Sequence, residues 1–128
     1  MNISKEQVNA ILSLPATERY KHFVKQVADR REVWGLYDEG WAMSADDYGA
    51  QYLALWPAQE YAELLKNEEW RTFVSKAIDL SEFLDETLAD LAMKKIGVAV
   101  FIVPSDKGVV IDSRSLRDDI RLELEKYE

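Results

Sequence analysis

The stretch from Val33 to Leu65 reads VWGLYDEGWAMSADDYGAQYLALWPAQEYAELL and holds three of the four tryptophans of the chain. Short runs with alternating apolar residues are separated by two polar breaks that contain glycine, a pattern typical of half-buried strands joined by turns. The runs are Val33–Tyr37, Trp41–Ser44 and Tyr52–Trp56. Because proline suits the first turn of a helix, Pro57 is expected to end the third strand and open a helix. The stretch therefore predicts a three-stranded meander that leads into a helix.

Two helices are predicted before this stretch by capping residues and by apolar residues at helical spacing. Ser4 and Gln7 have the spacing of a capping box, in which each side chain accepts a hydrogen bond from the other residue's backbone N–H. Pro15 breaks this first helix and then suits the first turn of a second helix. The apolar stripe of the second helix runs from Ala16 to Ala28.

Three later segments are expected to be strands. Thr72–Ile78 fits a helix or a strand, and we favour a strand because Asp79 and Glu82 mark the start of another helix immediately beyond it. Val98–Val103 reads VAVFIV, which is apolar at both odd and even positions and hence on both faces of a strand. Such a strand is covered on both faces, so we expect it in the centre of the sheet. Val109–Ile111 follows a turn as a third, short strand.

A final helix is expected to begin at Asp112 or Ser113. The predicted order is ααβββαβαββα, which indicates an α+β fold. Its sheet would be mostly antiparallel, made of the three-stranded meander and the C-terminal strands, with helices packed on it. We find no repeat, low-complexity tract or linker, and 128 residues suit one globular domain, so residues 1–128 are predicted to form a single domain.

The composition excludes several kinds of chemistry. There is no cysteine and only one histidine, so disulfides, thiolate metal sites, cysteine nucleophiles and multi-histidine metal sites are excluded. No phosphate-binding glycine loop or dinucleotide fingerprint is present, so no cofactor is predicted. The net charge of −8 and the scattered basic residues argue against nucleic acid and anionic membranes as partners. The polar first residues and the lack of a long apolar segment lead us to expect a soluble, cytoplasmic protein.

Aromatic residues flank the first two connections of the meander and suggest a surface for a partner. Trp34 and Trp41 could lie on one face as a platform, since tryptophan and tyrosine are enriched at binding hot spots. The same side chains could instead fill the core. The pattern favours the core for Trp34 and Trp56. It leaves both interpretations open for Trp41 and Tyr48, which lie beside polar turns.

Four acidic residues, Asp38, Glu39, Asp46 and Asp47, lie in the same two connections. Carboxylates could act as a general acid and base or bind a hard cation. The spacing matches no calcium loop and Asp is an ordinary turn residue, so solvated turns are favoured and no metal site is predicted. Beside Trp41, Asp38 and Glu39 would suit a basic, partly apolar protein partner through steering and a cation–π contact. In the tight connection that they form, Gly40 is expected to supply a positive φ.

His22 is the only histidine and lies on the flank of the apolar stripe of the second helix. A Ser-His-Asp triad would have to use it, and the chain has no nucleophile-elbow motif. We therefore predict a structural role for His22 and assign no catalytic residue.

Five blocks of the sequence, taken in order, resemble a family of small bacterial proteins catalogued as domain of unknown function 2750. The blocks are WGLYDEGWAMS, LALWPAQEYAELL, IDLSEFLDETLADL, VAVFIVP and GVVIDSRSLRDDI, and the similarity runs from Val8 to about Glu125. The resemblance implies a stand-alone bacterial domain and favours a strand before IDLSEFL. It implies no activity, cofactor or catalytic residue.

Three hypotheses about function follow. The first is a non-enzymatic binding or regulatory module with an acidic surface, which would bind a basic protein partner through Trp41, Tyr48, Asp38 and Glu39. The second is a small enzyme or ligand-binding domain that uses the aromatic and acidic loops, which an open apolar cleft with inward-facing carboxylates would favour. The third is an acidic immunity-type protein that masks a basic toxin.

Overall fold

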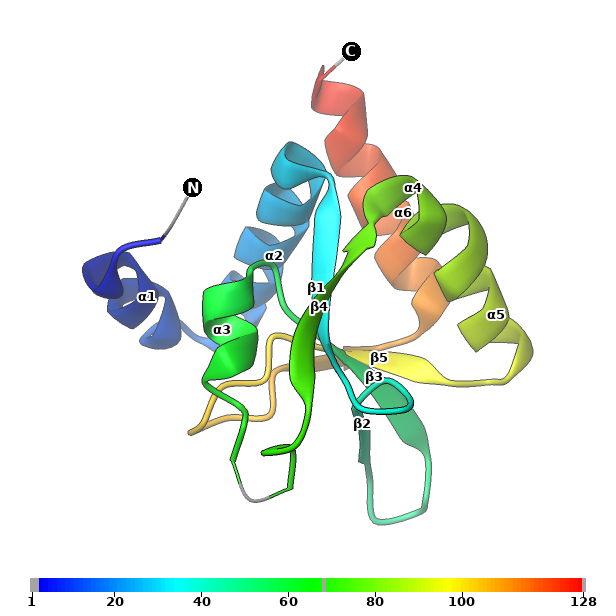
Figure 1. Cartoon of the computed structure of the whole chain (residues 1–128). Coiled ribbons are helices and arrows are strands. Elements are labelled where there is room, and N and C mark those ends of the chain that lie inside the picture. The colour runs from blue at the N-terminus through cyan, green and yellow to red at the C-terminus, as the bar shows by residue number, and fades with distance from the viewer. Residues whose placement is uncertain (1–2, 68, 128) are drawn as a thin grey trace.

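The computed structural model describes residues 3–67 and 69–127 and combines helices with mostly antiparallel sheets, which confirms the α+β prediction (Figure 1). The strands are β1 (Glu32–Tyr37), β2 (Met43–Ala45), β3 (Gln51–Leu55), β4 (Val74–Asp79), β5 (Gly97–Val100) and β6 (Val109–Ile111). The helices are α1 (Lys5–Leu12), α2 (Ala16–Arg30), α3 (Gln59–Glu63), α4 (Leu80–Glu82), the π-helical segment η1 (Phe83–Thr87), α5 (Leu88–Met93), α6 (Ser113–Leu124) and the 3₁₀ turn η2 (Glu125–Tyr127).

The strands form a four-stranded sheet and a separate two-stranded ribbon. The sheet has the order β2-β3-β5-β6, in which β3 and β5 are parallel and the other neighbours are antiparallel. In the ribbon, β1 pairs antiparallel with β4, from Glu32 opposite Asp79 to Tyr37 opposite Val74. Figure 1 shows the ribbon crossing the molecule between α3 and the helices α4 and α5.

The predicted three-stranded meander is wrong for its first strand. β1 meets the other two strands of the predicted meander only at isolated bridges, Trp34 with Trp56 and Tyr37 with Trp41. One edge of β1 is paired along its whole length with β4, and the other edge is shared between these two bridges. A continuous ladder with β2 therefore does not form, and only β2 and β3 make the predicted hairpin.

The later strands agree better with the prediction. β4 (Val74–Asp79) overlaps most of Thr72–Ile78, which confirms a strand there. β5 lies between β3 and β6, so the central position predicted for Val98–Val103 is confirmed, but the strand ends at Val100. Phe101 has a φ of 65°, in the left-handed region that few non-glycine residues adopt, so the chain turns out of the sheet there. The Phe101 N–H still donates to the Leu55 carbonyl at 2.9 Å.

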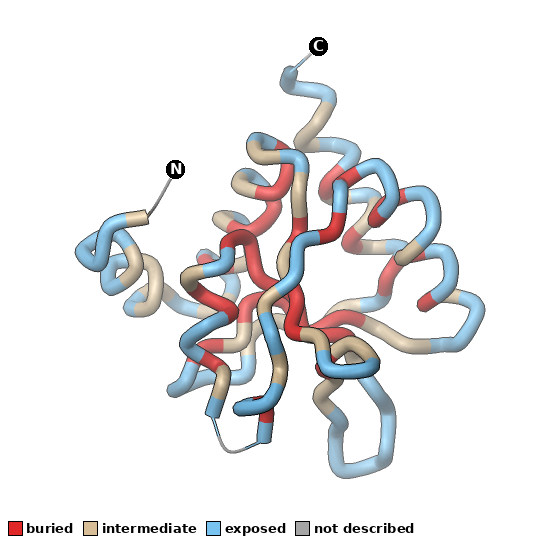
Figure 2. The backbone as a smooth tube through the Cα atoms, viewed as in Figure 1, coloured by how far each residue is buried: buried red, intermediate tan, exposed pale blue. Residues whose placement is uncertain are grey.

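The helix α1 begins at the predicted capping box. The Gln7 N–H donates to Ser4 Oγ at 3.2 Å, and the Ser4 N–H donates to Gln7 Oε1 at 3.1 Å. No residue of α1 is buried, and Figure 2 shows it as an exposed and half-buried coil at one side of the molecule. Val8, Ile11 and Leu12 of α1 are only partly buried where they pack against the core.

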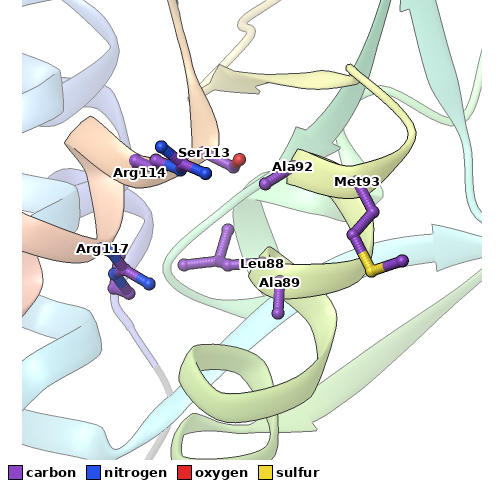
Figure 3. Close-up of a pocket in the computed structure, with 7 residues that line it drawn as sticks. All are labelled: Leu88, Ala89, Ala92, Met93, Ser113, Arg114 and Arg117. Atoms are coloured by element: carbon purple, nitrogen blue, oxygen red, sulfur yellow. The ribbon is translucent and has the colours of Figure 1, made fainter.

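The helices α4, η1 and α5 follow one another without a break, where one helix was predicted. The Asp79 carboxylate caps the start by accepting the N–H of Ser81 at 3.0 Å and of Glu82 at 3.3 Å. The η1 segment has the wider π-helical turn, a rare feature that is frequently found at functional sites. Beyond it, α5 packs beside α6 (Figure 3).

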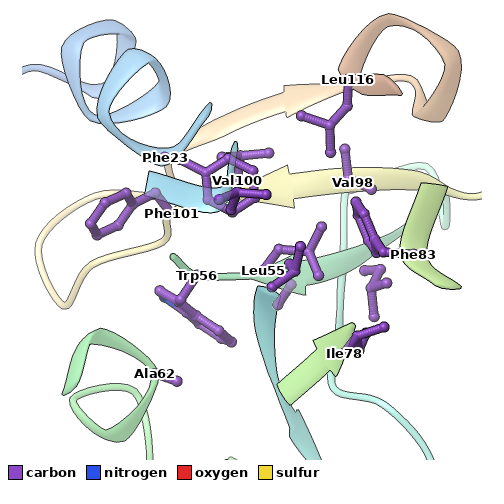
Figure 4. Close-up of a cluster of buried hydrophobic side chains, with 14 of the residues drawn as sticks. Phe23, Leu55, Trp56, Ala62, Ile78, Phe83, Val98, Val100, Phe101 and Leu116 are labelled. Atoms are coloured by element: carbon purple, nitrogen blue, oxygen red, sulfur yellow. The ribbon is translucent and has the colours of Figure 1, made fainter. Parts of the chain in front are cut away.

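The main core lies on one face of the four-stranded sheet. The sheet residues in this core are Leu53, Leu55, Val98 and Val100. Phe23 of α2 and Leu116 of α6 are fully buried and belong to the same cluster (Figure 4). Trp56 is also fully buried, and its Nε1 donates to the Ile102 carbonyl at 2.8 Å. The structure thus confirms a core role for Trp56.

A hydrogen bond from Tyr20 Oη to Asp119 Oδ2 joins α2 to α6, and we expect Tyr20→Phe to weaken this junction. The loss should lower the free energy of unfolding by about 1 kcal/mol, as for a typical partly buried hydrogen bond. Burial, and then the bond to Asp119, raises the pKa of Tyr20 strongly. A raised pKa favours the protonated form in the fold, so this contribution is present below about pH 10 and is lost as the pH rises through the folded pKa. Urea unfolding of both proteins at neutral and alkaline pH checks this, and a constant difference across that range would contradict it.

Candidate functional site

The first candidate is an aromatic patch on one face of the ribbon, which we name the Tyr37–Trp41 surface and define as Tyr37, Trp41, Val74 and Lys76. Tyr37 lies opposite Val74 and Gly35 lies opposite Lys76, so these positions share one face of the ribbon. The Trp41 indole lies over Gly35, where a Cβ atom would be 2.9 Å from both Cε3 and Cζ3 of the ring. The missing side chain of Gly35 therefore makes the space that the indole occupies.

The rings of this surface are already covered in part by a cation of the chain itself. The rings of Tyr37 and Trp41 meet edge to face with their centroids 5.1 Å apart. Lys76 Nζ lies 4.4 Å from the Tyr37 centroid and 5.7 Å from the Trp41 centroid. A cation–π contact at an exposed site is worth about 0.5–1 kcal/mol, so Lys76 helps to hold both rings in place.

The first connection brings Asp38 and Glu39 close in sequence to this surface, with both side chains exposed. The Thr72 hydroxyl donates to Asp38 Oδ2 at 2.7 Å, which ties the connection to the segment before β4. The positive φ of this connection belongs to Glu39, at 57°. Gly40 does not have a positive φ, so the prediction for Gly40 is wrong. Asp38 and Glu39 thus lie in the connection that leads to Trp41, and their role in partner binding stays a prediction.

Tyr48 stands apart from this group. It lies in the β2–β3 connection and is 96% exposed. Among the described residues its ring packs against no other aromatic ring, whereas Trp41 packs against Tyr37. Trp41 itself is half-buried, so it belongs neither wholly to the core nor wholly to the surface.

Trp34 and Trp41 do not share one face, so the alternative of a platform made of both residues is wrong. Successive residues of a strand point to opposite faces, so Trp34 faces away from Gly35 and from the indole above it. Trp34 Nε1 donates to Glu32 Oε2 at 2.6 Å. The half-buried Trp34 ring lines a different cavity together with Arg30 and residues of α3.

A groove of about 610 Å³ lies between the β2–β3 connection and the loops around Trp70 and Pro104. Asp46 accepts hydrogen bonds there from the N–H groups of Tyr48 at 2.9 Å and Ala50 at 3.0 Å, and from the Tyr52 hydroxyl at 3.0 Å. Burial raises the pKa of Asp46, but these hydrogen bonds outweigh it and hold the pKa below its usual value. A carboxylate of this kind organises a turn and is a poor proton donor at neutral pH.

Asp106, another acid of the groove, also has a hydrogen-bonding partner. It pairs with Arg19, whose Nη2 lies 2.6 Å from Asp106 Oδ2. This hydrogen bond holds the pKa of Asp106 below its usual value in spite of partial desolvation. The lowered pKa values of Asp46 and Asp106 make both carboxylates poor general acids at neutral pH. Among the described residues, no group of three or more His, Asp or Glu side chains is arranged to hold a metal ion.

His22 packs among aromatic rings. Its ring lies 6.5 Å from that of Tyr61 and 6.3 Å from that of Phe101. Burial, and then the charges of Arg30 and Lys25, lowers the pKa of His22, so the imidazole is neutral at pH 7. These contacts agree with a structural role.

Two important residues escaped the sequence reasoning. Arg19 is 2% exposed and lies between Ala16 and Phe23 on the buried stripe of α2, a position that could have signalled a buried charge. Lys76 could be placed on the Tyr37–Trp41 surface only after β4 was known to pair with β1. Its helical or strand spacing alone carries no such signal.

Comparisons with known proteins identify a family for the chain and assign it no activity. None of the described helices has the length and apolar character needed to span a bilayer. Neither the curated proteins nor the solved structures include a significant match. The model of the family described as "Protein of unknown function (DUF2750)" matches residues 20–120, within the range from Val8 to about Glu125 over which the resemblance was seen. The match covers most of the chain, and the protein belongs to the DUF2750 family.

Proposed function

We propose that this protein is a non-enzymatic binding module that docks a protein partner on the Tyr37–Trp41 surface. The observation that supports this most is the Trp41 indole, which is seated on Gly35 and remains partly exposed. Tryptophan anchors offer a large contact area for little conformational entropy and dominate many interfaces. Since Tyr37 and Lys76 already hold the ring, ordering it on binding would cost little.

The partner that suits this surface is a protein with a basic, partly apolar face. The chain carries a net charge of −8, and Asp38 and Glu39 are exposed at the edge of the surface. These acids would steer a basic partner and set the salt dependence of association. Because Lys76 already lies over the rings, the basic groups of the partner would meet the acids while its apolar groups contact the indole. A basic toxin masked by an immunity-type protein would be one partner of this kind.

We expect Trp41→Ala to weaken partner binding by about 2 kcal/mol or more, roughly thirtyfold in Kd, as for a hot-spot tryptophan. Its cost to stability should stay below the ~3–5 kcal/mol of a buried tryptophan, because Trp41 is only half-buried. The partner would first be captured on the immobilised wild-type protein from the native cell. Its affinity for each purified variant would then be measured together with thermal unfolding.

Tyr127→Ala is the matched control, because Tyr127 is an aromatic residue that is 56% exposed on the C-terminal turn. It should leave the affinity unchanged. Asp38→Asn and Glu39→Gln should slow association and flatten its salt dependence. Tyr48→Ala shows whether the interface reaches the β2–β3 connection. A partner that binds wild type and Trp41→Ala equally well would remove the basis of the proposal.

A further inference from the structure

A cleft of about 280 Å³ lies between α5 and α6, close to the size of small-ligand pockets. Its lining consists of Leu88, Ala89, Ala92, Met93, Ser113, Arg114 and Arg117 (Figure 3). The cleft thus carries two arginines and no acidic side chain, although the chain as a whole is strongly acidic. It shares no residue with the Tyr37–Trp41 surface.

The two arginines have unused hydrogen-bonding capacity. Arg114 and Arg117 are three residues apart on α6, so they are neighbours on its surface. In the described part of the chain, Arg117 Nε is buried and has no hydrogen-bond acceptor. The nearby Asp118 Oδ1 lies 3.8 Å from it, too far for a hydrogen bond. A buried donor without an acceptor costs about 1–3 kcal/mol. An oxyanion that brought an oxygen to Arg117 Nε would therefore recover this free energy.

Ser113 adds a second donor directed into the cleft. It is 3% exposed and belongs to the lining of the cleft. Figure 3 shows this hydroxyl directed towards Ala92 of α5. The start of α6 is already capped, because the Asp112 carboxylate accepts the Ser115 N–H at 2.8 Å. An anion here would therefore be held by side chains rather than by the helix terminus.

The opposite wall of the cleft is apolar. Leu88, Ala89 and Ala92 come from α5, and Met93, which is 84% exposed, lies at the rim. The η1 segment directly precedes this wall. Methionine is flexible and adapts its shape to a ligand. An apolar wall thus faces two cations.

We propose that the α5–α6 cleft binds a small organic oxyanion, a phosphate or a carboxylate that carries a short apolar group. The guanidinium groups of Arg114 and Arg117 match the oxygens of either anion in bidentate geometry. The Ser113 hydroxyl donates a further hydrogen bond, and the apolar group packs against the α5 wall. This site is independent of the partner surface proposed above.

The test is an NMR titration of the full chain with butyl phosphate, hexanoate and inorganic phosphate. We expect saturable shifts of the Nε–H signals of Arg114 and Arg117 and of the Met93 methyl, with a Kd of about 1 mM or tighter for at least one organic anion. Tighter binding of butyl phosphate would identify a phosphate ligand, and tighter binding of hexanoate a carboxylate. Inorganic phosphate should bind more weakly and leave the Met93 methyl unshifted. Equal affinity for inorganic phosphate would overturn the role of the apolar wall.

Variants separate this site from the general effect of positive charge. Arg114→Gln and Arg117→Gln should each weaken binding about tenfold or more. Arg121→Gln is the matched control, because Arg121 lies further along α6, outside the cleft, with its guanidinium 3.9 Å from Asp85. If Arg117→Gln fails to fold, Arg117→Lys keeps the charge, removes the Nε donor and should also weaken binding. Equal losses in Arg121→Gln, or no saturable shift up to about 10 mM, would overturn the proposal.

Discussion

Gly108→Ala is expected to lower the free energy of unfolding by about 3 kcal/mol or more, through backbone strain and a steric clash together. Gly108 has a φ of 77°, where a side chain is disfavoured. A Cβ atom there would collide with the Val100 carbonyl oxygen and lie 2.9 Å from the carbonyl carbon and oxygen of Phe101. All of these atoms are backbone at the end of β5, so the clash cannot be relieved by rotating a side chain.

Gly49→Ala is the matched control for this prediction. Gly49 has a φ of 85°, but no atom lies within 4 Å of the position of its Cβ. It should therefore show only the strain of the left-handed backbone, about 1–2 kcal/mol. Chemical denaturation of the two variants separates strain from clash. If Gly108→Ala and Gly49→Ala lower the free energy of unfolding equally, the loop after β5 relaxes around the new Cβ atom and its close approach to Val100 is not essential.

Arg19→Ala should have the other large effect, a loss of about 3 kcal/mol or more in the free energy of unfolding, because it removes a buried apolar stem and the donor to two carbonyl groups. Arg19 Nη1 donates to the Leu14 carbonyl at 2.6 Å, Nε donates to the Phe101 carbonyl at 3.4 Å, and Nη2 contacts Asp106. The guanidinium therefore joins the start of α2 to the loop after β5. Truncation would leave two carbonyl groups without this donor.

Two further variants show which part of Arg19 matters. Arg19→Met keeps the apolar stem, so any loss that remains measures the polar contacts. Asp106→Asn should cost only about 1 kcal/mol, because the Asp106 side chain is 50% exposed and water can replace its partner. Since the pKa of Asp106 is lowered in the fold, its contribution is present above about pH 4 and fades as the pH falls through the folded pKa. The difference in the free energy of unfolding between wild type and Asp106→Asn should therefore become smaller in acid. A larger difference in acid would contradict this expectation.

The features that were predicted well depend on neighbours in the sequence. The box of Ser4 and Gln7 and the cap at Asp79 are contacts within one turn of helix, so spacing is enough to identify them. The central place of β5 follows from its apolar residues, which could be buried only between other elements.

The features that were missed depend on which distant segments meet. The pairing of β1 with β4 is decided by packing across the whole molecule, and with it the place of Lys76. The left-handed Phe101 ends β5 within a run that reads as one continuous strand. The α5–α6 cleft combines residues that are ordinary on their own helices. None of these contacts leaves a periodic signal in a single sequence.

The split of the strands into a sheet and a ribbon has a kinetic consequence. The partner of β1 and the parallel partner of β3 both lie roughly forty residues further along the chain. The connection from β1 to β4 contains β2, β3 and α3, and the connection from β3 to β5 contains α3, β4 and the helices from α4 to α5. Among the strand pairs of the described residues, only the β2–β3 and β5–β6 hairpins join strands that are neighbours in the sequence. Closing these large loops costs conformational entropy. This cost must be met before the contacts between β3 and β5 can stabilise the fold. A chain of this topology has a high contact order in its core and folds more slowly than a helical bundle of equal length.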